Sequence, residues 1–301
     1  MEIGMIGLGR MGGNMVLRLL RHQHRVIGFD RSADAVKDVQ GQGAVGAGSL
    51  QDLVNAFNDR PRIFWVMLPA GKPTSETIHE LVRLSSEGDI IIDGGNTNWR
   101  DAVQDAEYVR SNGRHYMDAG TSGGVWGNQY GYCLMVGAEK DVYDHCAPLL
   151  QSLAPDEGGL VHTGPEGSGH FVKMVHNGIE YAMMQAYAEG FNLMKHSAYP
   201  DMDLQAIAEA WRYGSVVRSW LLDLLADGLR KDPDLSTLEA YVEDTGEGRW
   251  TVDTAIDSAV PTPVIALALF ERFRSREPDS FADRMLAMLR NEFGGHAVRP
   301  A

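Results

Sequence analysis

One predicted helix carries an amine and a carboxylic acid on the same face. In the stretch 170–181, Lys173 and Glu180 are seven residues apart, or about two helical turns. A lysine acts as a general base only where burial or a nearby cation lowers its pKa, and a desolvated glutamate can act as the matching acid. The stripe therefore predicts proton-transfer chemistry rather than a solvated face, and its other polar members are His176, Asn177 and Tyr181.

Two further features of this helix favour a catalytic face. Gly178 lies in the middle of the helix at a cost of about 1 kcal/mol relative to alanine, so we expect a close approach to the backbone there. The other faces are apolar, which predicts a helix that is buried nearly all round. These apolar residues are Phe171, Val172, Val175, Ile179, Met183 and Met184.

A glycine-rich turn near the N-terminus predicts a dinucleotide-binding site. It follows an apolar strand predicted over 2–8 and precedes a helix predicted over 14–21. In a GxGxxG turn the first glycine permits the tight turn and the second admits a pyrophosphate. The third allows close helix–strand packing, and the helix N-terminus supplies N–H groups. We assign the whole turn to the cofactor: Gly7, Leu8, Gly9, Arg10, Met11 and Gly12.

The residue after the second predicted strand (25–29) indicates which dinucleotide binds. The carboxylate of Asp30 can accept a hydrogen bond from the ribose 2′-hydroxyl and would repel a 2′-phosphate, which favours NAD. Arg31 and Ser32 follow immediately and can pair with that phosphate, so NADP stays possible. We also expect cofactor contacts at the end of the apolar run 62–68, from Leu68, Pro69 and Ala70.

The elements that must position these residues form two domains. Over 1–165, strand and helix patterns alternate and include the continuous apolar runs 62–68 and 89–93. This predicts a Rossmann-type, doubly wound α/β sheet that is mostly parallel. A Gly/Pro-rich segment at 155–169 marks the boundary. We expect an all-α substrate and dimerisation domain over 166–301, with helices at 171–195, 204–213, 216–230, 251–258, 264–274 and 281–290.

The composition excludes several classes of protein. The chain has 301 residues with 27 basic and 41 acidic side chains, a formal charge of −14, so neither nucleic acid nor an anionic membrane is an expected partner. We expect no signal peptide, and the sequence has no apolar run near the ~18–20 residues of a membrane span. Cys133 and Cys146 are expected to be reduced core thiols, and no histidine spacing indicates a metal site. We expect a soluble, cytoplasmic protein without a metal.

Stretches spread over nearly the whole chain resemble the β-hydroxyacid dehydrogenase family. The N-terminal family pattern matches 5–15 (MIGLGRMGGNM). Within that family, the chain is similar to the decarboxylating 6-phosphogluconate dehydrogenases, and its length resembles their short-chain subgroup, in which NAD preference is frequent. The matching stretches are 93–96 (DGGN), 120–124 (GTSGG), 173–181 (KMVHNGIEY) and 290–296 (RNEFGGH).

The resemblance implies oxidative decarboxylation of 6-phosphogluconate to ribulose 5-phosphate and CO2. Lys173 would take the proton of the C3 hydroxyl as hydride leaves for the nicotinamide, and Glu180 would protonate the resulting enediol at C1. The residues that would hold the sugar acid and the nicotinamide edge are Asn96, Ser122, Gly123, Gly124, His176 and Asn177. Those that would surround the phosphate are Tyr181, Arg249, Arg272, Arg290 and His296.

Some of these assignments depart from the family pattern. The long-chain signature KGTGKW reads TGEGRW at 245–250, where Arg249 keeps the charge, and Arg272 is placed only by its context LFER. An ordinary surface ion pair is the alternative for either arginine.

Arg290 and His296 lie after the last predicted helix. In the family such a tail completes the active site of the neighbouring subunit, which implies a homodimer or a higher even homo-oligomer.

Two other functions remain open. A dehydrogenase of a small unphosphorylated 3-hydroxy acid, such as hydroxyisobutyrate or tartronate semialdehyde, would share the lysine and asparagine but would not need His176, Glu180, Tyr181 and the Arg/His tail together. A non-catalytic dinucleotide sensor would have lost the lysine or the acid, and both are present. The sequence also leaves the pathway open between the oxidative pentose phosphate route and gluconate utilisation.

Overall fold

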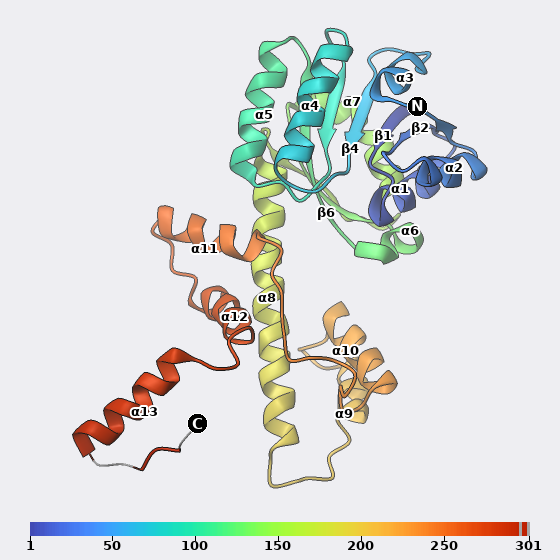
Figure 1. Cartoon of the computed structure of the whole chain (residues 1–301). Helices are drawn as coiled ribbons and strands as arrows, with labels where there is room; N and C mark the ends of the chain where they lie inside the picture. Colours follow the sequence, from blue (N-terminus) through green and yellow to red (C-terminus); the bar gives the residue numbers. More distant parts are fainter. Residues whose placement is uncertain (295–296, 300–301) are drawn as a thin grey trace. The chain divides into compact units, whose positions relative to one another are not determined.

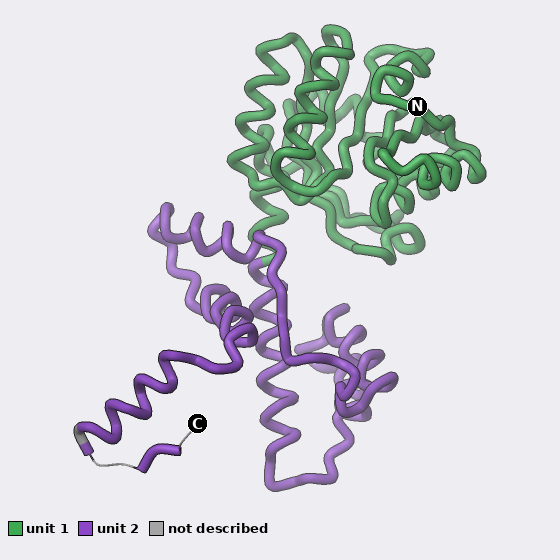
Figure 2. The backbone as a smooth tube through the Cα atoms, viewed as in Figure 1, with its two compact units in different colours: residues 1–177 green, residues 178–301 purple. Residues whose placement is uncertain are grey.

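The computed structural model describes residues 1–294 and 297–299 and divides the chain into two compact units. Unit 1 comprises residues 1–177 and unit 2 residues 178–301 (Figure 2), and Figure 1 labels the helices and strands of both. The border falls inside one long helix, α8 (Ser168–Lys195). The first turns of α8 therefore belong to unit 1 and the rest to unit 2.

Unit 1 is built on an eight-stranded sheet with the order β3-β2-β1-β4-β5-β6-β7-β8. All neighbouring strands are parallel except β6 and β7, which are antiparallel. The Rossmann-type, mostly parallel sheet expected from the sequence is confirmed. The strands are β1 (Glu2–Ile6), β2 (Arg25–Phe29), β3 (Val45–Gly46), β4 (Ile63–Val66), β5 (Ile90–Asp93), β6 (His115–Ser122), β7 (Cys133–Ala138) and β8 (Leu160–Gly164).

Alternating side chains of the central strands build two cores, one on each face of the sheet. In β4, Ile63 and Trp65 join one core, whereas Phe64 joins the other, because successive side chains of a strand point to opposite faces. The first core is covered by α1 (Arg10–Arg21), α2 (Ala33–Gly41) and α7 (Lys140–Leu153). The second is covered by α3 (Leu50–Asn55), α4 (Lys72–Leu84) and α5 (Trp99–Ser111).

Several elements of unit 1 were not predicted from the sequence. These are β3, α2, α7, the short 3-10 turn η1 (Gly124–Trp126) and α6 (Gly127–Tyr130). Helix α2 nevertheless begins with a recognisable cap, because the Ser32 hydroxyl accepts a hydrogen bond from the backbone N–H of Ala35 at 3.4 Å. The expectation of two core thiols was wrong for Cys133, which is exposed, whereas Cys146 is buried.

Every regular element described in unit 2 is a helix, as the sequence predicted. After α8 these are α9 (Leu204–Trp211), α10 (Trp220–Lys231), α11 (Glu247–Asp257), α12 (Pro263–Arg274) and α13 (Phe281–Gly294). The helix predicted over 216–230 begins later, because the Ser219 hydroxyl accepts the N–H of Leu222 and caps α10. Phe191 packs with α9 and α10, and Tyr181 with α12. Within the described part of the chain, no helix combines the length and the apolar character that crossing a membrane would require.

Candidate active site

The glycine turn between β1 and α1 has the geometry of a pyrophosphate cradle. Gly7 has a φ of +93°, which permits the sharp turn after β1. A Cβ on Gly12 would lie 1.9 Å from the carbonyl oxygen of Gly7, so only glycine allows the helix to approach. A Cβ on Gly9 would meet nothing within 4 Å, and α1 begins there without a side-chain cap. Open space in front of uncapped N–H groups fits the pyrophosphate of a dinucleotide.

The carboxylate of Asp30 lies directly against this turn. Its Oδ2 accepts the backbone N–H of Leu8 at 2.7 Å, and its Oδ1 accepts that of Ser32 at 2.8 Å. Each carboxylate oxygen has a second lone pair, so these bonds orient the group and leave it able to accept a ribose hydroxyl. Arg31 is exposed and the Ser32 hydroxyl caps α2.

The loop after β4 borders the same turn. The Leu68 side chain comes within 2.9 Å of the position that a Cβ on Gly7 would occupy. Pro69 and Ala70 are exposed, and the Thr74 hydroxyl donates to the Pro69 carbonyl at 2.9 Å, which holds the loop in place. The structure thus brings Leu68 to the glycine turn, as a shared cofactor site requires.

Further predicted residues follow β5 and β6 at the same edge of the sheet. Because β1, β4, β5 and β6 are parallel neighbours, their carboxyl ends lie along one edge. In open α/β sheets this edge is where ligands bind. Asn96 follows β5 and is exposed, and Ser122 ends β6. After Ser122 the backbone turns through Gly123 and Gly124, which have φ values of +127° and +52°.

The first turns of α8 add polar groups to unit 1. Lys173 is only 8% exposed, and a Cβ on Gly120 of β6 would lie 2.5 Å from the Cβ of Lys173. One turn further, His176 Nε2 lies 3.3 Å from the Ser122 hydroxyl and His176 Nδ1 lies 2.9 Å from Asn177 Oδ1. The structure thus places the predicted lysine, histidine, asparagine and serine together at the sheet.

The expectation that α8 is buried nearly all round was wrong. Val175 is half-buried, and the other five apolar residues named for its flanking faces are each at least 36% exposed. The packed elements of this chain cover only part of a 28-residue helix. The expected close approach at Gly178 is confirmed, since a Cβ there would lie 2.8 Å from Thr251 of α11. The exposed residues are Phe171, Val172, Ile179, Met183 and Met184.

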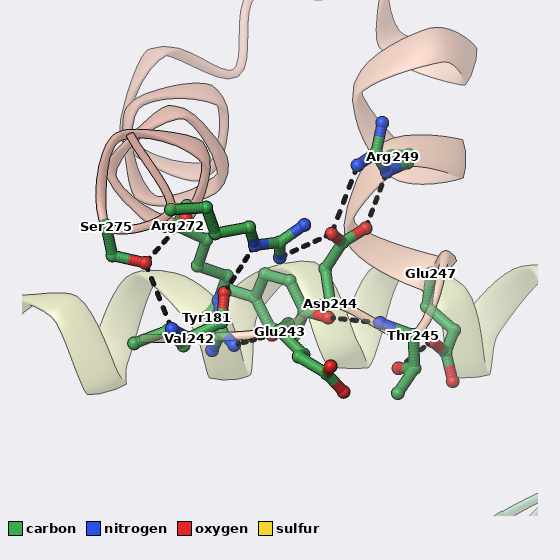
Figure 3. Close-up of polar contacts among 10 residues, drawn as sticks. Tyr181, Val242, Glu243, Asp244, Thr245, Glu247, Arg249, Arg272 and Ser275 are labelled. Atoms are coloured by element: carbon green, nitrogen blue, oxygen red, sulfur yellow. Dashed lines mark hydrogen bonds and ion pairs between the residues drawn. The ribbon is translucent and has the colours of Figure 1, made fainter. Parts of the chain in front are cut away.

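In unit 2, Tyr181 and Arg272 are in direct contact. The Arg272 guanidinium carbon lies 3.6 Å from the centre of the Tyr181 ring, a cation–π arrangement. Arg272 also donates to the Glu243 carbonyl at 2.8 Å, and the Tyr181 hydroxyl accepts the N–H of Thr245 at 3.3 Å (Figure 3). Glu180, the neighbouring residue of α8, is half-buried.

Arg249 is held by an acid that the sequence analysis did not single out. Its guanidinium donates to both oxygens of Asp244 at 2.6 and 3.1 Å (Figure 3). Arg276 donates to the same carboxylate at 2.6 Å. The Arg249 hydrogen bond, with that of Arg276, lowers the pKa of Asp244 to about 2 against the opposing effect of burial. Arg249 thus forms the ion pair that was its alternative assignment, although 49% of its side chain stays exposed.

This ion-pair cluster predicts a pH-dependent stability. Because the Asp244 pKa is about 2 in the folded protein and its ordinary value is 3.8, its contribution is present above pH 3.8 and is lost as the pH falls toward 2. We expect Asp244→Asn to lower stability by about 1 kcal/mol at pH 6, as for a partly exposed ion pair. Thermal unfolding at pH 6 and pH 3 should show this difference shrinking. Asp227→Asn, which removes the exposed partner of Arg230, is the control. A difference that grows toward pH 3 would contradict the assignment.

The last two predicted residues are placed differently from the rest. Arg290 lies within α13, which continues to Gly294, so the expectation that it follows the last helix was wrong. Arg290 is exposed. His296 lies outside the described residues.

Comparison with known proteins accounts for both parts of the chain. Residues 2–164 match the NAD binding domain of 6-phosphogluconate dehydrogenase, and residues 169–290 match the 6-phosphogluconate dehydrogenase C-terminal domain. The chain is 43% identical over 299 residues to the NAD(+)-dependent, decarboxylating 6-phosphogluconate dehydrogenase of Haloferax volcanii, covering 99% of this chain and 98% of that one. It is 41% identical over 298 residues to the putative 6-phosphogluconate dehydrogenase YqeC of Bacillus subtilis, covering 99% of each chain.

A solved structure gives the same result. The Plasmodium falciparum 6-phosphogluconate dehydrogenase, determined in its apo form and with NADP+ or 6-phosphogluconate, matches with a TM-score of 0.85 and 27% identity. The match covers 100% of this chain and 67% of that longer one. The chain therefore belongs to the 6-phosphogluconate dehydrogenase family.

Proposed function

We propose that the protein oxidises and decarboxylates 6-phosphogluconate to ribulose 5-phosphate and CO2, with reduction of NAD. The observation that carries this proposal is the buried Lys173, one turn from the linked side chains Ser122, His176 and Asn177. The same helix continues to Glu180, two turns beyond the lysine. An amine, a carboxylic acid and a row of hydrogen-bonding groups are what a β-hydroxy acid needs for oxidation followed by loss of its carboxylate.

Each proton transfer is assigned to a side chain of α8. Lys173 as the neutral amine takes the proton of the C3 hydroxyl, and NAD, when bound at the glycine turn, would supply the acceptor for the C3 hydrogen as hydride. The protonated Lys173 then donates to the C3 oxygen as the C1–C2 bond breaks, so that CO2 leaves and an enediol remains. Glu180 donates a proton to the carbon that becomes C1 of ribulose 5-phosphate, and the now neutral Lys173 takes the hydroxyl proton back from the former C3 oxygen, which becomes the C2 carbonyl. Asn96, Ser122 and His176 position the sugar acid.

The residues of unit 2 supply the groups that suit a phosphate. Arg249 and Arg272 carry guanidinium groups, whose N–H donors match phosphate oxygens, and Tyr181 carries a hydroxyl. The carboxylate of Asp244 holds Arg249 in a fixed orientation. We propose that these three residues, with Arg290 and His296, bind the phosphate of the substrate.

A direct assay tests the function. Purified protein is mixed with 6-phosphogluconate and either NAD or NADP, and the reduced-nicotinamide absorbance is followed together with CO2 release. We expect both signals in equal amounts. Turnover of hydroxyisobutyrate or tartronate semialdehyde without turnover of 6-phosphogluconate would replace the proposal with a small hydroxy-acid dehydrogenase. A protein that binds NAD but turns over none of these would be a sensor.

The position of Asp30 predicts the choice of cofactor. The Asp30→Ser variant removes a negative charge beside the adenosine ribose, so we expect the ratio of kcat/KM for NADP to that for NAD to rise by about tenfold, or 1.4 kcal/mol. Initial rates with each cofactor at saturating 6-phosphogluconate measure this ratio. Asp34→Ser, which removes an exposed acid four residues away, should leave it unchanged. An unchanged ratio in Asp30→Ser would remove the ribose contact from the proposal.

Exposed apolar side chains of unit 2 support a homodimer or a higher even homo-oligomer. Val264, Leu267 and Phe270 of α12 are 53–64% exposed, and Leu286 and Leu289 of α13 are 59% and 48% exposed. Large exposed apolar surfaces are typical of subunit interfaces. Sedimentation equilibrium should give at least twice the 33.1 kDa chain mass. A monomer at micromolar concentration would contradict this proposal.

The two domains have separate roles in this proposal. Residues 1–165 form the dinucleotide-binding domain, and residues 166–301 form the helical substrate and dimerisation domain. The cytoplasmic location stays a prediction of the sequence.

A further inference from the structure

Three buried titratable side chains meet at the start of α8, and none of them has a role in the proposed proton transfers. Asp93 ends β5, Asp118 lies in the middle of β6, and His170 lies in the first turn of α8. Their exposed fractions are 0%, 0% and 2%. Buried ionisable groups are rare unless they are paired or have a function.

The contacts of the three side chains join two strands to the helix. His170 Nε2 lies 3.3 Å from Asp93 Oδ2, an ion pair. The Asp118 carboxylate accepts the backbone N–H groups of Gly167 and His170 at 2.6 and 2.7 Å, and so caps the N-terminus of α8 from the sheet. Asp93 Oδ1 accepts the N–H of Gly95 at 3.0 Å, which holds the turn that leads to Asn96.

The start of α8 packs closely against the backbone of strands β6 and β7. A Cβ on Gly120 of β6 would lie 2.7 Å from the Gly169 carbonyl oxygen as well as 2.5 Å from the Lys173 Cβ. A Cβ on Gly137 of β7 would lie 2.4 Å from Asp118 Oδ1, and one on Gly169 would lie 2.5 Å from the Met135 carbonyl oxygen. Glycine at all three positions lets the helix start rest on the strands.

The charges around His170 favour its protonated form. Burial lowers the pKa of His170, but the facing carboxylates of Asp93 and Asp118 raise it by more than burial lowers it. The net pKa of His170 therefore lies above the usual value. Burial raises the pKa of Asp93, but the facing His170, together with hydrogen-bond donors such as the Gly95 N–H, lowers it, so that the net pKa lies below the usual value. Asp105 of α5 and the Tyr116 hydroxyl, 3.4 Å from Asp93, are two further titratable groups coupled to Asp93, and Tyr116 is also coupled to Asp118.

We propose that His170 is a positioning residue. Its ion pair with Asp93 connects the Asn96 turn to the first turn of α8, and this connection fixes the position of Lys173 relative to Asn96. Lys173 is one turn after His170, and Asn96 is three residues after Asp93. A rotation or slide of α8 on the sheet would move Lys173 relative to Asn96. This inference rests on the proposed function for its catalytic consequence.

The test uses the full-length protein and the variants His170→Asn and Asp93→Asn. A misplacement of about 1 Å is expected to lower kcat about 100-fold. The Kd for NAD, measured by fluorescence titration, should change less than about twofold, because the glycine turn belongs to β1 and α1. The isosteric Asp93→Asn should show the same separation of kcat from NAD binding. His145→Asn, on an exposed histidine of α7, should leave both values unchanged.

Two further measurements separate positioning from a general loss of stability. Hydrogen exchange without substrate should speed up at residues 94–97 and 168–174 in both single variants, while β1 and α1 stay protected. In the double variant Asp93→Asn/His170→Asn, kcat should fall no further than in either single variant, because the two residues act as one pair. The pH profile of kcat should also shift in the single variants, since the surroundings of Lys173 change.

The outcomes separate this inference from the proposed function. An unchanged kcat in His170→Asn, or faster exchange spread evenly over unit 1 with loss of NAD binding, would overturn the positioning role. Additive losses in the double variant would do the same. Absence of turnover by the unmodified protein would overturn the proposed function alone. The hydrogen exchange of the variants would still show whether the His170–Asp93 pair holds the start of α8 against the Asn96 turn.

Discussion

The variant Lys173→Met is expected to lose at least about 10³-fold in kcat, within the range observed for removal of a general acid–base group. Methionine has a similar length and is apolar, so it fits a site where the lysine is only 8% exposed. The variant retains the shape of the helix but has no amine to accept the C3 hydroxyl proton. Rapid mixing with NAD and 6-phosphogluconate should show no early rise in reduced nicotinamide.

The matched control for this variant lies on the same helix. Lys195 forms an ion pair with Asp234 at 2.6 Å, and its side chain is 48% exposed. We expect Lys195→Met to keep full activity, and both variants to bind NAD with an unchanged Kd. Substantial oxidation by Lys173→Met would show that another group accepts the proton, and would remove the central residue of the mechanism.

The variant Glu180→Gln is expected to separate oxidation from the overall reaction. The amide retains the size of the side chain but cannot donate the proton that the enediol carbon requires. We expect steady-state turnover to fall about 10²-fold. Oxidation of the substrate should continue in part, because Lys173 is intact. Rapid mixing should therefore show a burst of reduced nicotinamide, followed by slow formation of ribulose 5-phosphate.

The control for Glu180 is a second glutamate of α8. Glu189 is exposed and accepts a hydrogen bond from Gln185 at 2.9 Å, so Glu189→Gln should leave turnover unchanged. Normal steady-state turnover in Glu180→Gln would exclude this residue as the acid. Loss of the burst together with turnover would place Glu180 in the oxidation step instead.

The features that the sequence predicted correctly depend on neighbouring residues. The GxGxxG turn needs a positive φ at Gly7 and close helix packing at Gly12, and both are properties of a six-residue segment. The apolar runs around β4 and β5 predict strands buried on both faces because each run is continuous. The polar stripe on α8 follows from helical periodicity alone.

The features that the sequence did not predict depend on contacts between distant segments. Asp93 and His170 are 77 residues apart, and nothing in either segment says that they pair. Asp118 lies within a buried strand, and a buried acid needs a hydrogen-bonding partner. The sequence of the strand does not show which residues supply that partner. Helix α7 contains Pro148, which obscures its periodicity.

By itself, the sequence determined the cofactor turn, the alternation of strands and helices, and the face of α8 that carries Lys173 and Glu180, because local backbone preference and side-chain spacing specify these. Only the tertiary structure decided which acids meet at the start of α8, that Asp244 holds Arg249, and how much of the apolar surface of α8 stays exposed. Each of these depends on segments brought together by folding of the whole chain, where burial makes an ion pair or a hydrogen bond obligatory.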